Sequence, residues 1–302
     1  MNLALFSIAG ATSLLFGRAR PERICENAVM KFSGHLGKML TTLDDPVRYI
    51  LPLDDERIGM NDLVGQHISL TYAGEIHCIA CGRKTNKSFS QGYCYPCFKS
   101  LPECDSCIIK PEQCHYFAGT CRNPAWGEEH CLQDHYVYLA NSSGIKVGIT
   151  RGSQIPTRWL DQGASEALPL FRVKNRLLSG KLEVILKQHV ADRTDWRKML
   201  KGTPTPVDLP AKRDELVKTC SRQIDVVKQE HGADSLEFLP EATTVTIRYP
   251  VSSHPDKVTS LNFDKTPAIS GILQGIKGQY LILDRGVLNI RKFSGYKIGF
   301  EY

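Results

Sequence analysis

The stretch CIACGRKTNKSFSQGYCYPC, residues 78–97, contains two Cys-x-x-Cys pairs separated by twelve residues. Each pair places two thiolates at the tip of a tight turn, and two facing turns form a tetrahedral set of sulfurs that suits zinc. Gly82 and Gly92 stand where such turns need room for the backbone. The spacing therefore predicts a structural zinc ion with four ligands: Cys78, Cys81, Cys94 and Cys97. The alternatives are four buried free cysteines or a redox pair, although redox pairs occur singly.

A second group of cysteines with interleaved histidines follows directly. It comprises Cys104, Cys107, Cys114, Cys121 and Cys131, with His115, His130 and His135. One metal ion needs only four ligands, so part of this group is not bound to metal. We expect Cys104 and Cys107 to form one knuckle, completed by two of the other three cysteines, or by a histidine in place of one thiolate. Zinc and an iron–sulfur cluster both remain open here, because both accept all-cysteine ligation.

The cysteines also indicate a cellular compartment. Nine of the eleven lie between Cys78 and Cys131. A disulfide framework usually spreads over a small secreted domain, whereas repeated pairs in one stretch are typical of metal binding in a reducing compartment. We therefore expect a cytoplasmic protein in which metal holds together residues 77–131, a segment with little core of its own.

The composition argues against a membrane protein and against wholesale disorder. The 302 residues are 42% hydrophobic and 23% charged, as in ordinary globular proteins. A membrane-spanning helix needs about 20 consecutive apolar residues, and the longest apolar run, 1–16, is shorter and interrupted. A secretory signal requires a Lys or Arg before its apolar run, and none precedes this one. Because MKFSGHLGKML begins like a first strand at Met30, we expect 1–29 to be an extension outside the mature fold.

The remaining chain divides by its hydrophobic pattern. Short apolar runs separated by Pro, Asp and Gly predict β-rich segments over 30–76 and 245–302, and we expect these two to pack into one sheet or barrel. Between them we expect the zinc-binding block 77–131, a small module 132–200, and a linker with an amphipathic helix over 201–244. This arrangement predicts an α+β fold.

Within the module, β-branched and aromatic runs on either side of Asn-Ser-Ser-Gly predict a hairpin over 135–150. PTRWLDQGA predicts a short helix with Pro156 near its first turn, and LPLFRVKN predicts a third strand. Apolar residues at helical spacing from Leu182 to Val190 predict a further helix, with Ser179 as its cap.

Positive charge is concentrated around this module. Residues 141–220 contain 15 Lys or Arg and 8 Asp or Glu, a balance of +7, whereas the whole chain carries +6. Basic residues neutralise phosphates, and nearby aromatic residues stack on unpaired bases. We therefore expect binding to nucleic acid, DNA or RNA, through four residues: Arg151, Arg172, Lys174 and Arg176. The alternative is an ordinary solvated basic face.

Residues 135–195 resemble the GIY-YIG nuclease module. In that family two strands carry two sequence triplets, a helix carries an arginine, and a later helix carries a metal-binding glutamate. The triplets correspond here to Tyr136-Val137-Tyr138 and Lys146-Val147-Gly148. Arg158 follows the second triplet at a suitable distance, and Glu183 follows the predicted third strand.

The resemblance implies phosphodiester hydrolysis with a divalent cation, Mg²⁺ if the module is active. In such chemistry a tyrosine or a metal-bound water provides the nucleophile, an arginine offsets phosphoryl charge, and a glutamate holds the cation. The catalytic candidates are Tyr138, Lys146, Arg158 and Glu183. Lys146 replaces the usual second tyrosine, so it acts only if burial lowers its pKa, or it binds phosphate instead. The alternative is an ordinary strand aromatic beside an ordinary ion pair.

The whole arrangement is similar to an uncharacterised bacterial family that joins a zinc ribbon, a second cluster (CDSCIIKPEQCH, 104–115) and HYVYLANSSGIKVGITR (135–151). This resemblance runs from about Met30 to the C-terminus and implies no established activity. We predict a zinc-binding, nucleic-acid-binding protein with a candidate nuclease module. The first alternative is a non-catalytic adaptor for RNA, DNA or a protein complex, and the second is an iron–sulfur or redox protein.

Overall fold

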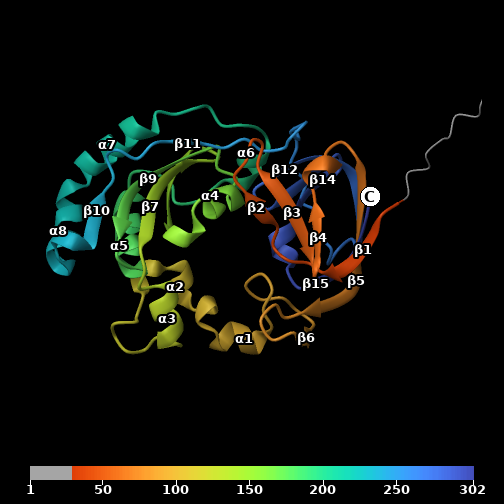
Figure 1. Ribbon diagram of the computed structural model, residues 1–302, viewed down its shortest axis with the longest axis horizontal. Coiled ribbons are helices and arrows are strands. Elements are labelled where there is room, and N and C mark those ends of the chain that lie inside the picture. The colour runs from red at the N-terminus through yellow and green to blue at the C-terminus, as the bar shows by residue number, and fades with distance from the viewer. Residues whose placement is uncertain (1–28) are drawn as a thin grey trace, which may run out of the picture.

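The computed structural model describes residues 29–302 (Figure 1). The predicted extension, 1–29, lies outside the described residues apart from its last position. The described chain has mixed helices and antiparallel sheets, so the predicted α+β class is confirmed. None of the helices between residues 29 and 302 combines the length and apolar character that a membrane crossing requires.

Strands from both ends of the described chain form one antiparallel sheet, called here the terminal sheet. Its order is β1 (Lys31–His35), β15 (Tyr296–Glu301), β5 (His67–His77), β12 (Ala268–Lys277), β13 (Tyr280–Leu283) and β14 (Gly286–Asn289). β6 (Lys84–Thr85) pairs with the end of β5. A smaller sheet consists of β2 (Leu40–Thr42), β3 (Arg48–Leu53) and β4 (Glu56–Gly59). Both sheets contribute to one hydrophobic core.

The two ends of the described chain contain the same β unit. In each copy a hairpin with a two-residue turn leads through a 3-10 turn into a long strand. The copies are β3, β4, η1 (Asn61–Leu63) and β5, and β13, β14, η6 (Ile290–Phe293) and β15. Gly65 and Gly295 precede the long strands and have φ of 94° and 85°, which other residues rarely adopt. The second copy contains η6, which places Arg291 at the boundary with the module.

A third sheet, called the module sheet, has the order β10–β9–β7–β8 and combines strands of the module with β10 from a later part of the chain. β7 (His135–Asn141) and β8 (Ile145–Arg151) form a hairpin, and β9 (Glu166–Val173) pairs with the other edge of β7. β10 (Leu236–Phe238) and β11 (Val245–Thr246) pair with β9. α4 (Thr157–Asp161) follows β8, and α5 (Arg176–Leu186) follows β9. The hairpin, the short helix and the third strand lie in the segments where the sequence pattern predicts them.

The helices differ from the sequence-based expectation at their ends. Asn175, not Ser179, caps α5, because its side chain accepts a hydrogen bond from Leu178 N. Ser179 lies inside the helix, where its hydroxyl donates to Arg176 O. The expected amphipathic helix forms two helices that meet at Cys220: α7 (Leu209–Thr219) and α8 (Ser221–His231). A separate short helix, α6 (Trp196–Leu200), precedes them.

The module sheet is covered on both faces. Val137 and Leu139 of β7 pack in the core that contains α5, α7 and α8. Tyr138 lies on the opposite face because neighbouring strand residues alternate, and it packs with Trp159 of α4 in the core of the terminal sheet. The module and the terminal sheet therefore share a hydrophobic core at this face.

The cysteine block, residues 77–131, connects the two sheets along one side of the molecule (Figure 1). It contains the short helices α1 (Tyr95–Ser100), α2 (Ser106–Ile109) and α3 (Pro124–His130), with 3-10 turns η2 (Pro102–Cys104) and η3 (Pro111–Gln113). Gly180 of α5 allows η3 to approach closely, because a Cβ there would lie 2.3 Å from Glu112 N. Arg176, also in α5, donates to Ile108 O at 2.6 Å. The block is thus attached to the helix that carries Glu183.

Candidate functional site

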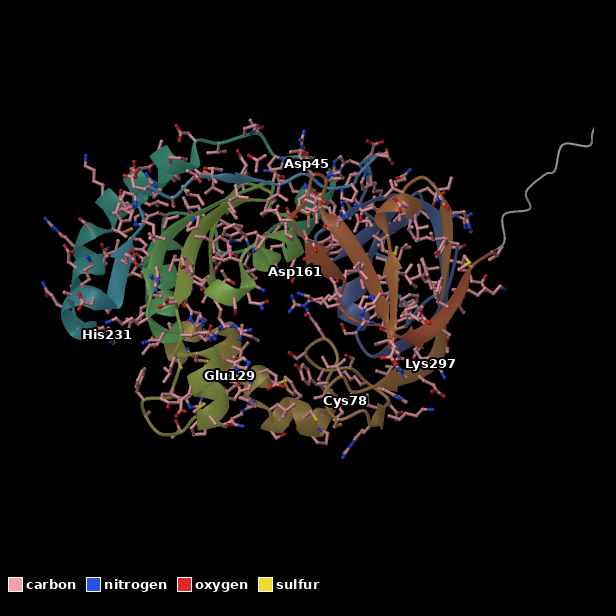
Figure 2. All side chains as sticks on the ribbon, viewed as in Figure 1. Asp45, Cys78, Glu129, Asp161, His231 and Lys297 are labelled. Atoms are coloured by element: carbon pink, nitrogen blue, oxygen red, sulfur yellow. The ribbon has the colours of Figure 1, made fainter. Side chains whose placement is uncertain are left out.

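The first cysteine site, Cys78, Cys81, Cys94 and Cys97, forms where β5 ends and α1 begins (Figure 2). All four sulfurs lie within 4.8 Å of one another, and the Cys81 and Cys94 sulfurs are 3.7 Å apart. Tetrahedral Zn–S bonds of about 2.3 Å place thiolates about 3.8 Å apart. These four residues can therefore hold a metal ion such as zinc.

The turns of the first cysteine site favour a thiolate. Burial disfavours the charged form of Cys78, but backbone N–H groups of Cys94, Cys81 and Ala80 lower its pKa to about 6. Gly82 and Gly92 have φ of 70° and 138°, the left-handed region that glycine adopts readily. Four thiolates in one place repel one another, and a bound cation removes that repulsion, so metal binding and proton release are coupled.

The remaining cysteines of the block separate into two groups. One cavity is lined by a set of four that we call the second cysteine set: Cys107, Cys114, Cys121 and Cys131. Cys104 does not line this cavity. Burial, and then the charge of Glu103, raise the pKa of Cys104 to about 11. Cys78 of the first site also raises it. Of the expected Cys104–Cys107 knuckle, Cys107 lines this cavity and Cys104 does not.

The histidines interleaved with or following the second group of cysteines have other partners. His115 lies 3.5 Å from Asp105, whose carboxylate also pairs with Arg122 at 2.7 Å. His130 stacks on Trp126. His135 is fully buried, and burial lowers its pKa to about 4. Asp105, Cys107 and His115 lie close enough together to be possible metal ligands. The ion pair with Arg122 already accounts for the position of the Asp105 carboxylate.

The four catalytic candidates lie close together in the structure, and we call them the phosphate site after the ligand that the sequence resemblance implies: Tyr138 on β7, Lys146 on β8, Arg158 on α4 and Glu183 on α5. Tyr138 is fully buried, and Lys146 is 3% exposed. Burial raises the pKa of Tyr138 to about 12, with Arg158 and Glu183 as the charges that act on it. Burial, and then the charge of Arg158, lower the pKa of Lys146 to about 8, while the charge of Glu183 acts in the opposite direction.

Steric crowding explains why the second triplet ends in glycine, Gly148. A Cβ at Gly148 would lie 2.7 Å from the Tyr138 hydroxyl oxygen, so only glycine leaves space for the phenol ring. The Tyr138 hydroxyl donates to Gln162 Oε1 at 3.1 Å, and Lys146 Nζ donates to the same oxygen. Gln162 thus joins the two strand residues of the phosphate site. Sequence reasoning missed Gln162, since it lies in the turn after α4 and belongs to no motif.

Two further charged residues reach the phosphate site from distant positions. Val147 N donates to Ala191 O at 2.8 Å, which brings Asp192 beside the edge of β8. Burial and then Asp192 raise the pKa of Glu183, so the two carboxylates are close. Arg291 comes from η6 of the terminal sheet, and burial and then Arg158 lower its pKa. No local spacing in the sequence marks either residue.

A cavity of about 410 Å³ lies between the module and the terminal sheet. Its lining includes Lys146, Gln162 and Asp192 from the module, and Tyr280 and Arg291 from the terminal sheet. Asp161, at the end of α4, fixes this boundary, because it pairs with Lys38 and accepts a hydrogen bond from Gln279 at 2.8 Å (Figure 2). The terminal sheet therefore forms part of the wall beside Lys146.

The four residues expected to bind nucleic acid do not form one surface. Arg172 and Lys174 are exposed, and Arg172 pairs with Asp134 and Glu237. Arg176 instead donates to the backbone of the cysteine block. Arg151 lies at the end of β8 and is half-buried. Arg172 is thus exposed but paired with two carboxylates, Lys174 is exposed, and Arg176 is held by the fold.

These features define an α+β protein with a cysteine cluster that can hold a metal ion and with a cavity, lined by basic and acidic residues, between two sheets. The family model for a protein of unknown function (DUF2797) matches residues 65–298, and the chain belongs to this family. The predicted membership of an uncharacterised family is confirmed, while the family match does not identify a GIY-YIG module. No curated protein and no solved structure matches the chain.

Proposed function

We propose that this protein binds nucleic acid and hydrolyses a phosphodiester bond at the phosphate site with one divalent cation, Mg²⁺, while zinc at the first cysteine site holds the block that supports α5. One observation carries the proposal. The four candidate residues from β7, β8, α4 and α5 lie close together, and one of them, Lys146, lines a 410 Å³ cavity. These are the residues that the sequence resemblance selects.

The charges at the phosphate site favour an anionic ligand. Arg158 lies among several cations, because its charge contributes to the lowered pKa values of Lys146, Arg176 and Arg291, in each case after burial. Like charges held together in a partly buried place are stabilised by a bound anion. A phosphodiester has the required charge, and its oxygens accept the hydrogen bonds that arginine and lysine donate.

Each residue of the site has a distinct role in this proposal. Glu183 and Asp192 supply oxygen ligands of the kind that Mg²⁺ prefers, and the cation stabilises the leaving oxygen. Arg158 offsets the charge that develops on the phosphoryl oxygens. Lys146 holds the phosphate, with Gln162 as its neighbour. Tyr138 is fully buried and donates to Gln162, so its role is to position Gln162 rather than to attack phosphorus.

A second function, a non-catalytic adaptor for nucleic acid, is favoured by the same burial. Tyr138 is inaccessible to solvent, and only 3% of Lys146 is exposed. In the adaptor, Lys146 and Arg158 contact phosphate, and Glu183 balances their charge. The two functions predict the same binding and differ in cleavage.

The test is a cleavage assay with the full chain. Plasmid, single-stranded and double-stranded DNA and RNA are incubated with Mg²⁺ or with a chelator, and binding is measured in parallel. We expect Mg²⁺-dependent cleavage that Glu183→Gln abolishes with little effect on binding, because the shape is kept and the cation ligand is lost. Arg158→Ala should lower the rate by roughly 10²–10³-fold, as expected for loss of a group that stabilises transition-state charge.

The matched control is Glu237→Gln, which changes an exposed glutamate of the same sheet that pairs with Arg172. It should leave cleavage unchanged. Binding without cleavage by the unmodified protein would favour the adaptor. Absence of both binding and cleavage for every nucleic acid would refute the proposal.

A further inference from the structure

The second cysteine set lies around one small space. Cys107 lies in α2, Cys114 follows η3, Cys121 lies in the loop before α3, and Cys131 follows α3. All four side chains line a cavity of about 10 Å³, close to the room that one water-sized sphere needs. Cys107 and Cys131 are buried, and the other two are half-buried. Four free thiols from separate turns therefore share a space with room for a single ion.

The segment that carries these cysteines takes little part in the hydrophobic cores. None of the three core clusters in the described chain includes a residue between Cys78 and Cys131. Large apolar side chains of the segment face solvent instead: Ile109 is 83% exposed and Phe117 is 65% exposed. Its helices are short, α2 with four residues and α3 with seven, and helices this short do not form in isolation. A bound metal ion is a contact that can hold such turns together.

The four sulfurs are further apart than those of the first cysteine site. In the first site all four lie within 4.8 Å of one another, whereas the sulfurs of the second cysteine set, which all belong to the described chain, do not. Tetrahedral zinc places thiolates about 3.8 Å apart, so a bound ion draws these sulfurs inward. The movement is small, because the space between them is no larger than a water molecule. Cys114 and Cys121 lie outside the helices, so their side chains have the freedom for this adjustment.

The other possible ligands beside this cavity are engaged elsewhere. The Asp105 carboxylate pairs with Arg122 at 2.7 Å. His115 has Nδ1 2.8 Å from Thr120 Oγ1 and Nε2 3.5 Å from Asp105. Among the described residues, the one side-chain hydrogen bond of the second cysteine set runs from Cys121 Sγ to a backbone carbonyl at 3.4 Å. The four thiols are therefore the groups that are free to bind a metal ion.

Arginine side chains near the second cysteine set can offset negative charge. Four thiolates on one Zn²⁺ ion carry net negative charge, and nearby cations and hydrogen bonds stabilise such a site. Arg122 lines the cavity. Arg176 donates to Cys107 O at 3.5 Å and to Ile108 O at 2.6 Å. The second of these arginines also links the cysteine set to the first turn of α5.

We propose that Cys107, Cys114, Cys121 and Cys131 bind a second zinc ion and that Cys104, which does not line the cavity, is not a ligand. A space of about 10 Å³ has no room for a cluster of several iron and sulfide atoms. Four thiolates leave no open position on zinc, which is the pattern of a structural site. The ion joins α2, the loop before α3 and the end of α3, and it is independent of phosphodiester cleavage.

The test is metal analysis of the full chain, purified anaerobically without chelator from cells supplied with both zinc and iron. We expect about two zinc ions per chain, one from each cysteine site, and no iron. Cys114→Ser should lose about one of the two. Cys104→Ser is the matched control, since it alters a buried cysteine that does not line the cavity, and it should keep both. His115→Ala should also keep both, although His115 lines the cavity.

X-ray absorption by zinc in the unmodified protein keeps the proposal testable if a variant fails to fold. The average zinc ion should have about four sulfur neighbours at about 2.3 Å and no nitrogen or oxygen at about 2.0 Å. About one zinc per chain, even after Zn²⁺ is added under reducing conditions, would overturn the second site. Iron with acid-labile sulfide would overturn the choice of metal.

Loss of zinc in Cys104→Ser or His115→Ala equal to that in Cys114→Ser would overturn the ligand assignment, as would nitrogen or oxygen neighbours of zinc. Zinc content and nucleic-acid cleavage are separate readouts, so failure of one proposal is distinguishable from failure of the other.

Discussion

The first cysteine site and the phosphate site are assembled in opposite ways. The first draws its four ligands from a single stretch, residues 78–97, with each pair in one tight turn. The second takes Tyr138 and Lys146 from a hairpin, Glu183 from a later helix, and Arg291 from the other sheet. The comparison teaches that local turn spacing can be recognised in a sequence, whereas a site completed by packing depends on contacts between distant segments.

The largest expected effect comes from breaking the local site. Cys81→Ser should remove about one equivalent of zinc and unfold the cysteine block, since binding of structural zinc contributes on the order of 10 kcal/mol that is also folding free energy. Zinc analysis and thermal unfolding measure both consequences. Thr85→Ala is the control, because its hydroxyl bonds only to Lys87 within the same loop. Unchanged zinc content and melting temperature in Cys81→Ser would show that these cysteines are not ligands.

The parts of the fold that follow from local chemistry were predictable. The hairpin around Asn-Ser-Ser-Gly forms β7 and β8, PTRWLDQGA forms α4, and LPLFRVKN forms most of β9. In these segments the turn residues and the side-chain pattern favour one structure, and packing does not change it. The close sulfurs of the first cysteine site follow from its spacing for the same reason.

The parts that depend on competition or packing were not predictable. Asn and Ser are both good N-cap residues. Because β9 ends at Val173 and α5 begins at Arg176, Asn175 occupies the capping position. Cys104 and Cys107 have knuckle spacing, yet only Cys107 lines the cavity that it shares with other cysteines. Gln162, Asp192 and Arg291 reach the phosphate site only because α4, the edge of β8 and η6 meet there.

Two buried lysines, one in the phosphate site and one in the terminal sheet, allow a test with an effect of intermediate size. Lys146 belongs to the phosphate site, whereas Lys277 of the terminal sheet donates to Gly202 O, and burial lowers the pKa of each from 10.5 to about 8. Between pH 8 and 10.5 the unfolded chain binds more protons than the folded chain, so the free energy of unfolding rises with pH across this window. Below pH 8 each charged lysine destabilises the fold by on the order of 3 kcal/mol.

Lys146→Met and Lys277→Met should therefore both flatten the rise in stability between pH 8 and 10.5, measured by urea unfolding at several pH values. Only Lys146→Met should also weaken nucleic-acid binding, because only Lys146 lines the cavity. Equal loss of binding in Lys277→Met would mean that binding responds to general stability. A pH profile that neither variant alters would show that the two lysines do not titrate in this window.

The smallest expected effect tests whether the terminal sheet is part of the phosphate site. Arg291 lines the cavity, and Arg158 contributes to its lowered pKa after burial. If Arg291 neutralises one phosphate, Arg291→Gln should weaken binding several-fold and lower the slope of log affinity against log salt by about 0.9 for duplex DNA. Fluorescence anisotropy with labelled oligonucleotides between about 50 and 200 mM salt resolves such a change. Lys292→Gln is the matched control, because Lys292 is the next residue, carries the same charge, and is exposed. An equal change in slope for both variants would mean that the terminal sheet attracts nucleic acid only by its overall charge. A change confined to Arg291→Gln would mean that packing of the two sheets completes the site.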